Sequence, residues 1–145
     1  MSMCLAALVL LIVYAFWRFP ALRKTWYLPP RRGFVAMMYH HIGVLEDPQE
    51  EQFPFTIRPE MFERQLLFLK ANGYTLISLT ELETACKAGR SSVEKPVLLT
   101  FDDGHADNYF NLFPLLKKYN VPALIFLITD RIGTDGYLTW QQVQQ

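Results

Sequence analysis

Short apolar runs and helically spaced apolar residues follow each other along residues 34–145. Runs bounded by Gly, Pro or polar residues are typical of buried strands, and they lie at 34–39, 74–78, 96–101 and 123–128. Apolar spacing near 3.6 residues predicts helices at 59–72 and 107–119. The connections are too long for hairpins, so the alternation favours βαβ units and a parallel sheet.

Capping and breaking residues predict where the helices begin and end. Thr80 and Glu83 have the spacing of a capping box and predict a helix that ends at Gly89. Pro114 should kink the 107–119 helix or mark a first turn, because it lacks a backbone N–H. Thr139 is placed to cap a last helix.

The remaining positions complete the expected fold. Residues 41–55 are polar and contain Pro, which predicts a loop. The expected core residues of the two helices are Met61, Phe62, Leu66, Leu67 and Leu69 in the first, and Phe110, Leu112, Leu115 and Leu116 in the second.

The first residues form a separate segment. Residues 1–17 carry no charge and would make a helix of about 26 Å, near the thickness of a bilayer core. We expect a membrane anchor at 1–22, a basic, Pro-rich linker at 23–33 and one domain at 34–145. A cleaved signal peptide and a buried N-terminal helix are the alternatives. Basic residues after the apolar run favour a cytoplasmic domain by the positive-inside rule, whereas the function below favours an extracytoplasmic one.

Composition excludes several classes of protein. The chain has 145 residues, room for about one domain, and its 14 basic and 14 acidic residues cancel. A zero net charge argues against nucleic-acid binding, which needs a basic excess. With 51% hydrophobic and 19% charged residues the chain is not a disordered one. Two cysteines, Cys4 and Cys86, cannot make a disulfide scaffold.

Candidate chemistry is concentrated in the sequence Thr-Phe-Asp-Asp-Gly at 100–104. Ligands of parallel α/β proteins gather at the carboxyl ends of strands, and Asp102 and Asp103 follow a predicted strand. Successive strand side chains point to opposite faces, so both can face one cavity only if the chain turns, which Gly104 permits. A cation bound by one carboxylate would offset their repulsion and leave the other free as a base. An ordinary polar turn, with Asp103 capping the next helix, is the alternative.

The motif and its surroundings resemble the polysaccharide deacetylases, the NodB-homology or carbohydrate esterase family four. The resemblance extends over about residues 34–145. It includes Met38-Tyr39-His40-His41-Ile42, residues 62–78, Asp107-Asn108-Tyr109, residues 114–127 and Trp140. It implies the N-terminal half of an irregular (β/α) barrel and a hydrolase that removes acetyl groups from N-acetylated polysaccharide.

The resemblance also implies roles for single residues. Asp102 would be the catalytic base that takes a proton from water, and Asp103 would be a ligand of a divalent metal, most often zinc. His40 and Trp140 are candidates for substrate binding. Each also has a structural reading, His40 as a hydrogen-bonded residue at a strand end and Trp140 as a core or rim aromatic.

The sequence departs from the family after Trp140. The family completes its metal site with His-Ser/Thr-x-x-His, and no two of His40, His41 and His105 have that spacing. We therefore expect the N-terminal part of a longer protein. His105 could substitute as a ligand, although a solvated turn residue is the simpler interpretation, and Asp107 is expected to cap a helix.

Three functions remain open on the sequence. The first is a membrane-anchored deacetylase that is incomplete in this chain and acts on polysaccharide. The second is a truncated, non-catalytic domain, anchored to membrane lipid, that binds glycan or a partner. The third is Mg²⁺-dependent phosphoryl transfer, which the absence of a P-loop argues against.

Overall fold

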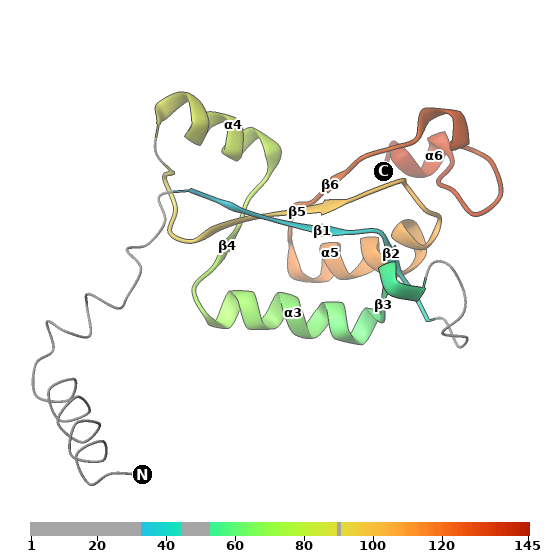
Figure 1. Cartoon of the computed structure of the whole chain (residues 1–145), viewed down its shortest axis with the longest axis horizontal. Coiled ribbons are helices and arrows are strands. Elements are labelled where there is room, and N and C mark those ends of the chain that lie inside the picture. Colours follow the sequence, from blue (N-terminus) through green and yellow to red (C-terminus); the bar gives the residue numbers. More distant parts are fainter. Residues whose placement is uncertain (1–32, 45–52, 90) are drawn as a thin grey trace, which may run out of the picture. The chain divides into compact units, whose positions relative to one another are not determined.

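A computed structural model describes residues 33–44, 53–89 and 91–145 (Figure 1). Gly33–Gln145 forms one compact unit. The predicted anchor at 1–22 and almost all of the predicted linker lie outside the described residues, so both stay predictions. Within the described ranges, no helix combines the length and the apolar character that a membrane crossing requires.

Strand β5 (Pro96–Phe101) is the centre of a parallel sheet, as its six buried residues lead one to expect. Strand β1 (Val35–Tyr39) pairs with it along its length, from Val35 opposite Val97 to Tyr39 opposite Phe101. On the other side, β4 (Thr75–Leu76) pairs with the beginning of β5 and β6 (Leu124–Ile125) with its end. All of these pairs are parallel, which confirms the predicted sheet type.

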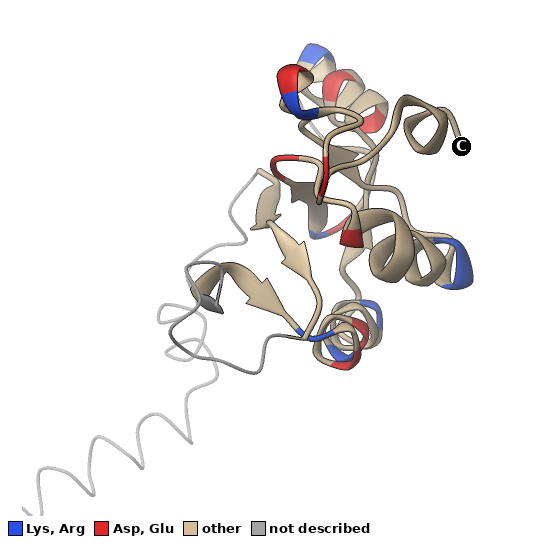
Figure 2. Cartoon of the chain, turned by 90° about the vertical axis from the view of Figure 1, so that its right-hand side faces the viewer, with Lys and Arg blue, Asp and Glu red and all other residues tan. Residues whose placement is uncertain are grey.

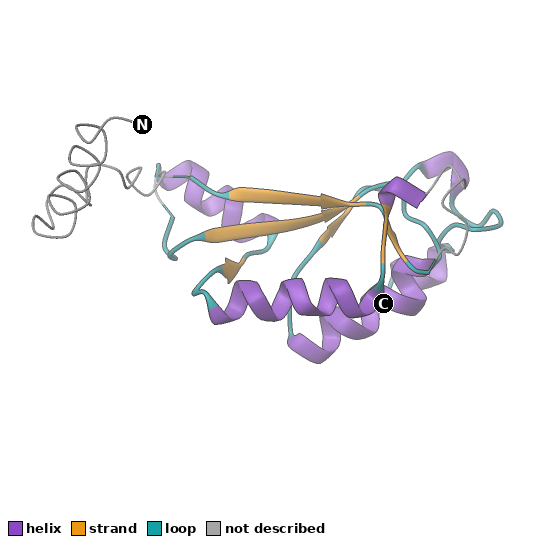
Figure 3. Cartoon of the chain, turned by 60° about the horizontal axis from the view of Figure 1, so that its bottom comes forward, coloured by secondary structure: helices purple, strands orange, loops and turns teal. Residues whose placement is uncertain are grey.

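The helices connect the strands as the alternation predicts. The long ones are α3 (Pro59–Ala71), α4 (Leu79–Ala88) and α5 (Phe113–Tyr119), with a short α6 (Trp140–Val143) near the C-terminus. Helices α3 and α5 lie together along one side of the sheet (Figures 1 and 3). Short pieces complete the chain: the 3₁₀ turns η1 (Phe53–Phe55) and η3 (Thr129–Arg131), and the π-helical turn η2 (Asn108–Leu112).

The core lies between β5 and the two adjacent helices. Alternate residues of β5 face α3, as the two-residue period of a strand requires. The buried residues of this cluster are Ile42, Phe62, Leu66, Leu69, Val97, Leu99, Phe101, Leu112 and Val121. The opposite face of the edge strand β1 is open, and Met38 there is 65% exposed. Figure 2 shows the charged residues mostly on helices and loops, with strands free of charge.

Two helix boundaries follow the predicted chemistry. Thr139 and Gln142 form a capping box at the start of α6, which confirms the predicted cap. Pro114 lies in the first turn of α5, the position where its missing N–H costs nothing. Because Pro114 cannot bond to the preceding turn, the predicted 107–119 helix is divided into η2 and α5.

Other local predictions were wrong. The capping box of α4 is made by Ser78 and Glu81 and not by Thr80 and Glu83, because Ser78 is the last extended residue before the helix begins at Leu79. Hydrogen bonds from Ser78 lower the pKa of Glu81. The predicted loop at 41–55 begins with strand β2 (His41–Ile42), which pairs with β3 (Thr56–Ile57).

Some expected core residues are exposed. Phe110 is 64% exposed, and Met61 and Leu67 are 45% and 47% exposed. Each lies on a helix whose neighbouring apolar residues already cover the sheet, so the sequence carries a wider apolar stripe than the sheet can bury.

Candidate active site

The Asp-Asp-Gly sequence forms a tight turn directly after β5. The backbone N–H of Asp102 still donates to the Tyr39 carbonyl at 2.9 Å, so Asp102 is held against the end of β1. Asp103 and Gly104 then both adopt the left-handed conformation, with φ of +70° and +71°. This confirms that the chain turns here. A left-handed aspartate is uncommon and often marks a functional position.

Later segments hold the turn in place. The Gly104 carbonyl accepts the Leu138 N–H at 2.9 Å, and the Phe101 carbonyl accepts the Phe126 N–H at 2.8 Å. Leu127 packs directly over Gly104, where any Cβ would lie 2.6 Å from its Cδ2. Glycine is therefore required for two reasons, its φ and this contact.

Asp102 faces His40, the residue that follows β1. The His40 Nε2 lies 3.9 Å from Asp102 Oδ2, and the two side chains are 23% and 29% exposed. Residues at the ends of two adjacent parallel strands are brought together here, as expected for such a sheet. Water can reach the Asp102 carboxylate.

Asp103 faces a different imidazole, that of His105. The His105 Nε2 lies 3.3 Å from Asp103 Oδ2, with the His105 side chain 14% exposed and that of Asp103 37%. His105 also forms a β-bridge with Tyr137. His105 is thus a packed residue, and its interpretation as a solvated turn residue was wrong.

His41 and Asp107 complete the cluster, and the sequence reasoning missed their pairing. The His41 Nδ1 lies 2.8 Å from Asp107 Oδ2, and the His41 ring stacks on His105 with centroids 3.6 Å apart. Burial, and secondarily the charge of His41, lowers the pKa of His105. Asp107 precedes η2 but makes no side-chain capping bond, contrary to its predicted role. Only the adjacency of His40 and His41 in sequence hinted at this arrangement.

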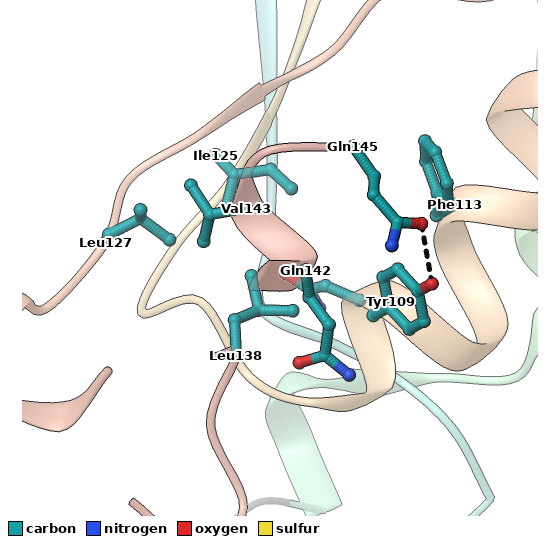
Figure 4. Close-up of a pocket in the computed structure, with 9 residues that line it drawn as sticks. Tyr109, Phe113, Ile125, Leu127, Leu138, Gln142, Val143 and Gln145 are labelled. Atoms are coloured by element: carbon teal, nitrogen blue, oxygen red, sulfur yellow. Dashed lines mark hydrogen bonds between the residues drawn. The ribbon is translucent and has the colours of Figure 1, made fainter. Parts of the chain in front are cut away.

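Two pockets among the described residues lie beside the carboxylates, and neither is lined by Asp102 or Asp103. His40 and Phe55 line a hollow of about 200 Å³ at the end of β1. A second pocket of about 280 Å³ lies between η2, β6 and α6, with Tyr109, Phe113 and Leu138 in its wall (Figure 4). Within the described chain the sheet has open edges at β1 on one side and at β4 and β6 on the other. Neither of these two pockets is the cavity that Asp102 and Asp103 were expected to share.

Trp140 is the fourth predicted site residue. It begins α6 and is 57% exposed. Its neighbour Leu138 is tied to Gly104, which places α6 after the same turn. The exposure agrees with a rim aromatic and excludes a core position, while contact with a substrate stays a prediction.

Known proteins resemble this chain in sequence. The polysaccharide deacetylase family matches residues 89–145. The poly-beta-1,6-N-acetyl-D-glucosamine N-deacetylase of Escherichia coli (strain K12) is 30% identical over 131 residues, covering 80% of this chain and 19% of that protein. The enzyme of that name from Staphylococcus epidermidis is 34% identical over 117 residues, covering 74% and 40%. The chain belongs to the polysaccharide deacetylase family.

Solved structures of deacetylases share the fold of this family member. The Streptococcus pyogenes deacetylase PplD, in complex with acetate, superposes with a TM-score of 0.68 at 33% identity, covering 77% of this chain and 50% of that one. IcaB from Ammonifex degensii gives a TM-score of 0.66 at 30% identity, covering 78% and 47%. The chain thus spans at most about half the length of these relatives.

Polysaccharide deacetylases are generally metal-dependent, which raises the question whether the residues present fit a metal. Asp103 and His105 offer an oxygen and a nitrogen, both suitable for zinc. Across the described ranges, however, no three His, Cys, Asp or Glu side chains are grouped so that they could hold an ion. A structural or catalytic zinc needs at least three protein ligands, so the described residues do not make a metal site by themselves.

Proposed function

We propose that this chain carries the first catalytic segment of a hydrolase that removes acetyl groups from N-acetylated polysaccharide. The observation that supports it most directly is the left-handed Asp103-Gly104 turn at the end of β5, which gives each of two neighbouring carboxylates its own imidazole partner. An Asp-Gly pair with both φ positive is common in tight turns, so the imidazole facing each carboxylate is the feature that an ordinary polar turn would not need. The similarity to N-deacetylases of poly-beta-1,6-N-acetyl-D-glucosamine suggests the substrate class.

In this proposal Asp102 is the general base. A water molecule attacks the acetyl carbonyl carbon and gives a proton to the Asp102 carboxylate. The carbon–nitrogen bond then breaks, the amine nitrogen takes a proton from the solvent, acetate leaves, and Asp102 returns its proton to the solvent. Asp102 is suited to this because its carboxylate is partly exposed and is followed by a turn that keeps it at the strand end. General bases of this kind contribute about 10²–10⁴-fold to a rate.

His40 and Trp140 are proposed to bind the substrate. His40 lies beside Asp102 and lines a hollow with Phe55, an aromatic ring that could lie against a sugar. Trp140 presents an exposed indole at the start of α6. Replacement of Trp140 by alanine should raise KM and leave kcat nearly unchanged if the indole only binds the glycan.

Asp103 is proposed as the first ligand of the divalent metal, with zinc as the expected ion. The bound ion would polarise the acetyl carbonyl and lower the pKa of water. Because the described residues do not complete a cage, the other ligands would have to come from residues beyond those described.

The test is acetate release by the full chain from an oligomer of β-1,6-linked N-acetylglucosamine, with and without added Zn²⁺. We expect Asp102→Asn to lower the rate by about 10²–10⁴-fold and Asp103→Asn to abolish the stimulation by Zn²⁺. Asp130→Asn, an exposed acid in η3, is the matched control and should keep full activity. Full turnover in the Asp102→Asn variant would contradict the assignment of the base.

The non-catalytic alternative is favoured because the part of the chain that the structure describes holds no group of three side chains that could bind a metal ion. It predicts that the chain releases no acetate with any added divalent metal, yet retains the same oligomer in equilibrium dialysis. Binding lost on substitution of Trp140 or His40, without turnover in the parent chain, would support this alternative.

Membrane attachment and an extracytoplasmic position are further parts of the proposal, and both depend on residues 1–22. Deletion of residues 1–17 should release the protein from membranes in a flotation assay. Continued flotation of the shortened chain would contradict the anchor.

A further inference from the structure

The two neighbouring carboxylates are separated by their partners. Asp102 faces His40, which follows β1, whereas Asp103 faces His105, which follows Gly104 in the same turn. The ring of His41 stacks on that of His105, and the Nδ1 of His41 is hydrogen-bonded to Asp107. Asp103 is therefore reached by a continuous series of contacts that starts at Asp107 and does not touch Asp102.

The series is anchored firmly at its far end. Asp107 Oδ2 contacts His41 Nδ1 at 2.8 Å, and Oδ1 accepts from Asn108 Nδ2 at the same distance. Asn108 is 1% exposed and also donates to the His40 carbonyl at 3.0 Å. Asn111 donates to the Ile42 carbonyl at 2.7 Å. These bonds tie η2 to the segment that carries His40 and His41.

The stacking of His41 on His105 passes the fixed position of the His41 ring on to the His105 ring. The His41 and His105 planes are 25° apart and their centroids 3.6 Å apart, so one ring cannot tilt without moving the other. On its other side His105 has Tyr137, with ring centroids 5.0 Å apart. His105 is thus confined between two rings, and the direction of its Nε2 is set by them.

We propose that Asp107, His41 and His105 act as a positioning relay that holds the Asp103 carboxylate in one orientation, apart from that of Asp102. Asp107 fixes the His41 ring, His41 fixes the His105 ring by stacking, and His105 Nε2–H donates to Asp103 Oδ2. Partners of this kind orient site residues, and their loss typically costs about 10–100-fold in affinity or activity. Only the use of the relay in catalysis depends on the proposed function. Its geometry involves neither substrate nor metal.

The relay requires a particular proton position on each ring. An ionised carboxylate only accepts hydrogen bonds, so neutral His41 must carry its proton on Nδ1 and neutral His105 on Nε2. Imidazole ¹⁵N chemical shifts of the full chain, measured well above the ordinary histidine pKa of about 6.5, distinguish the two tautomers. The opposite tautomer at either ring would overturn the relay, and this measurement needs no variant.

The orientation of Asp103 is the second readout. Three-bond scalar couplings to the Asp103 carboxyl carbon report whether χ1 occupies one rotamer or averages over several. We expect one rotamer in the parent chain and averaging in His105→Phe, which keeps a ring in place but cannot donate. Asp107→Asn and His41→Phe should also cause averaging, because the first loses the charged acceptor and the second keeps the stack without the bond to Asp107.

The controls separate the relay from the fold and from the proposed function. Asp130→Asn should leave the Asp103 couplings unchanged, and a dispersed amide spectrum shows that each variant is folded. If Asp107→Asn does not fold, the couplings of His41→Phe test the relay alone. A single, unchanged Asp103 rotamer in every variant that folds would refute the relay. A chain that releases no acetate but shows the expected tautomers and couplings would reject the proposed function and retain the relay.

Discussion

Replacement of Gly104 by alanine is the sharpest test of how the candidate site is built. Gly104 has a φ of +71°, and a Cβ added there would lie 2.6 Å from Leu127 Cδ2, with Leu127 Cα at 3.7 Å. The left-handed conformation costs a non-glycine residue about 1–2 kcal/mol, and forcing Leu127 aside costs about 1–3 kcal/mol more. We expect Gly104→Ala to lower the free energy of unfolding by about 2–5 kcal/mol, a large part of the 5–15 kcal/mol typical of a domain.

The two contributions can be measured separately. Gly73 has a φ of +73° but no atom within 4 Å of an added Cβ, so Gly73→Ala should show the conformational cost alone. Urea unfolding of the full chain gives both values, and the slope m should be unchanged. The double variant Gly104→Ala, Leu127→Ala should show a favourable coupling of about 0.5–3 kcal/mol, because the overlap is removed. A Gly104→Ala variant no less stable than Gly73→Ala would refute the close contact.

Three further predictions concern the elements that support the site. Ser78→Ala should lower the free energy of unfolding by about 1 kcal/mol in urea unfolding, because the α4 cap loses its bond to the Glu81 N–H; an unchanged midpoint would contradict the cap. Leu66→Ala should lower it by about 2–5 kcal/mol, since Leu66 is fully buried; a smaller loss would mean that the core collapses onto the vacated space. Hydrogen bonds from Lys118 and Tyr119 lower the pKa of Glu63 from its ordinary 4.5. The stabilisation is therefore present above the ordinary value and is lost as pH falls through the lowered one. The stability difference between the parent chain and Glu63→Gln should shrink in that acid range, and a constant difference would argue against this contact between α3 and α5.

Local chemistry explains why part of the fold followed from the sequence. The run from Pro96 to Phe101 is apolar but for one threonine, which suits a strand buried on both faces, and the structure buries all six residues. Gly104 predicted the turn because few residues other than glycine adopt its left-handed conformation. Thr139 predicted the start of α6 because its hydroxyl can accept a hydrogen bond from a backbone N–H of the first helical turn.

Competition between equivalent local signals explains the errors. Ser78 and Thr80 each precede a glutamate by three residues, and the structure selects Ser78, which is still extended where the helix begins. The apolar stripes of α3 and η2 are wider than the surface they cover, and packing decides that Leu66 of α3 is buried while Phe110 of η2 is exposed. Sequence periodicity gives the face of a helix but not the extent of the surface that covers it.

The sequence by itself determined the parallel α/β alternation, the position of the central strand and the turn that presents Asp102 and Asp103, because each depends on residues close together in the chain. Only the tertiary structure decided which group each carboxylate meets. His41 and Asp107 are 66 positions apart, and nothing local brings them into contact. That contact follows from the pairing of β1 with β5, which carries the end of one segment to the end of the other.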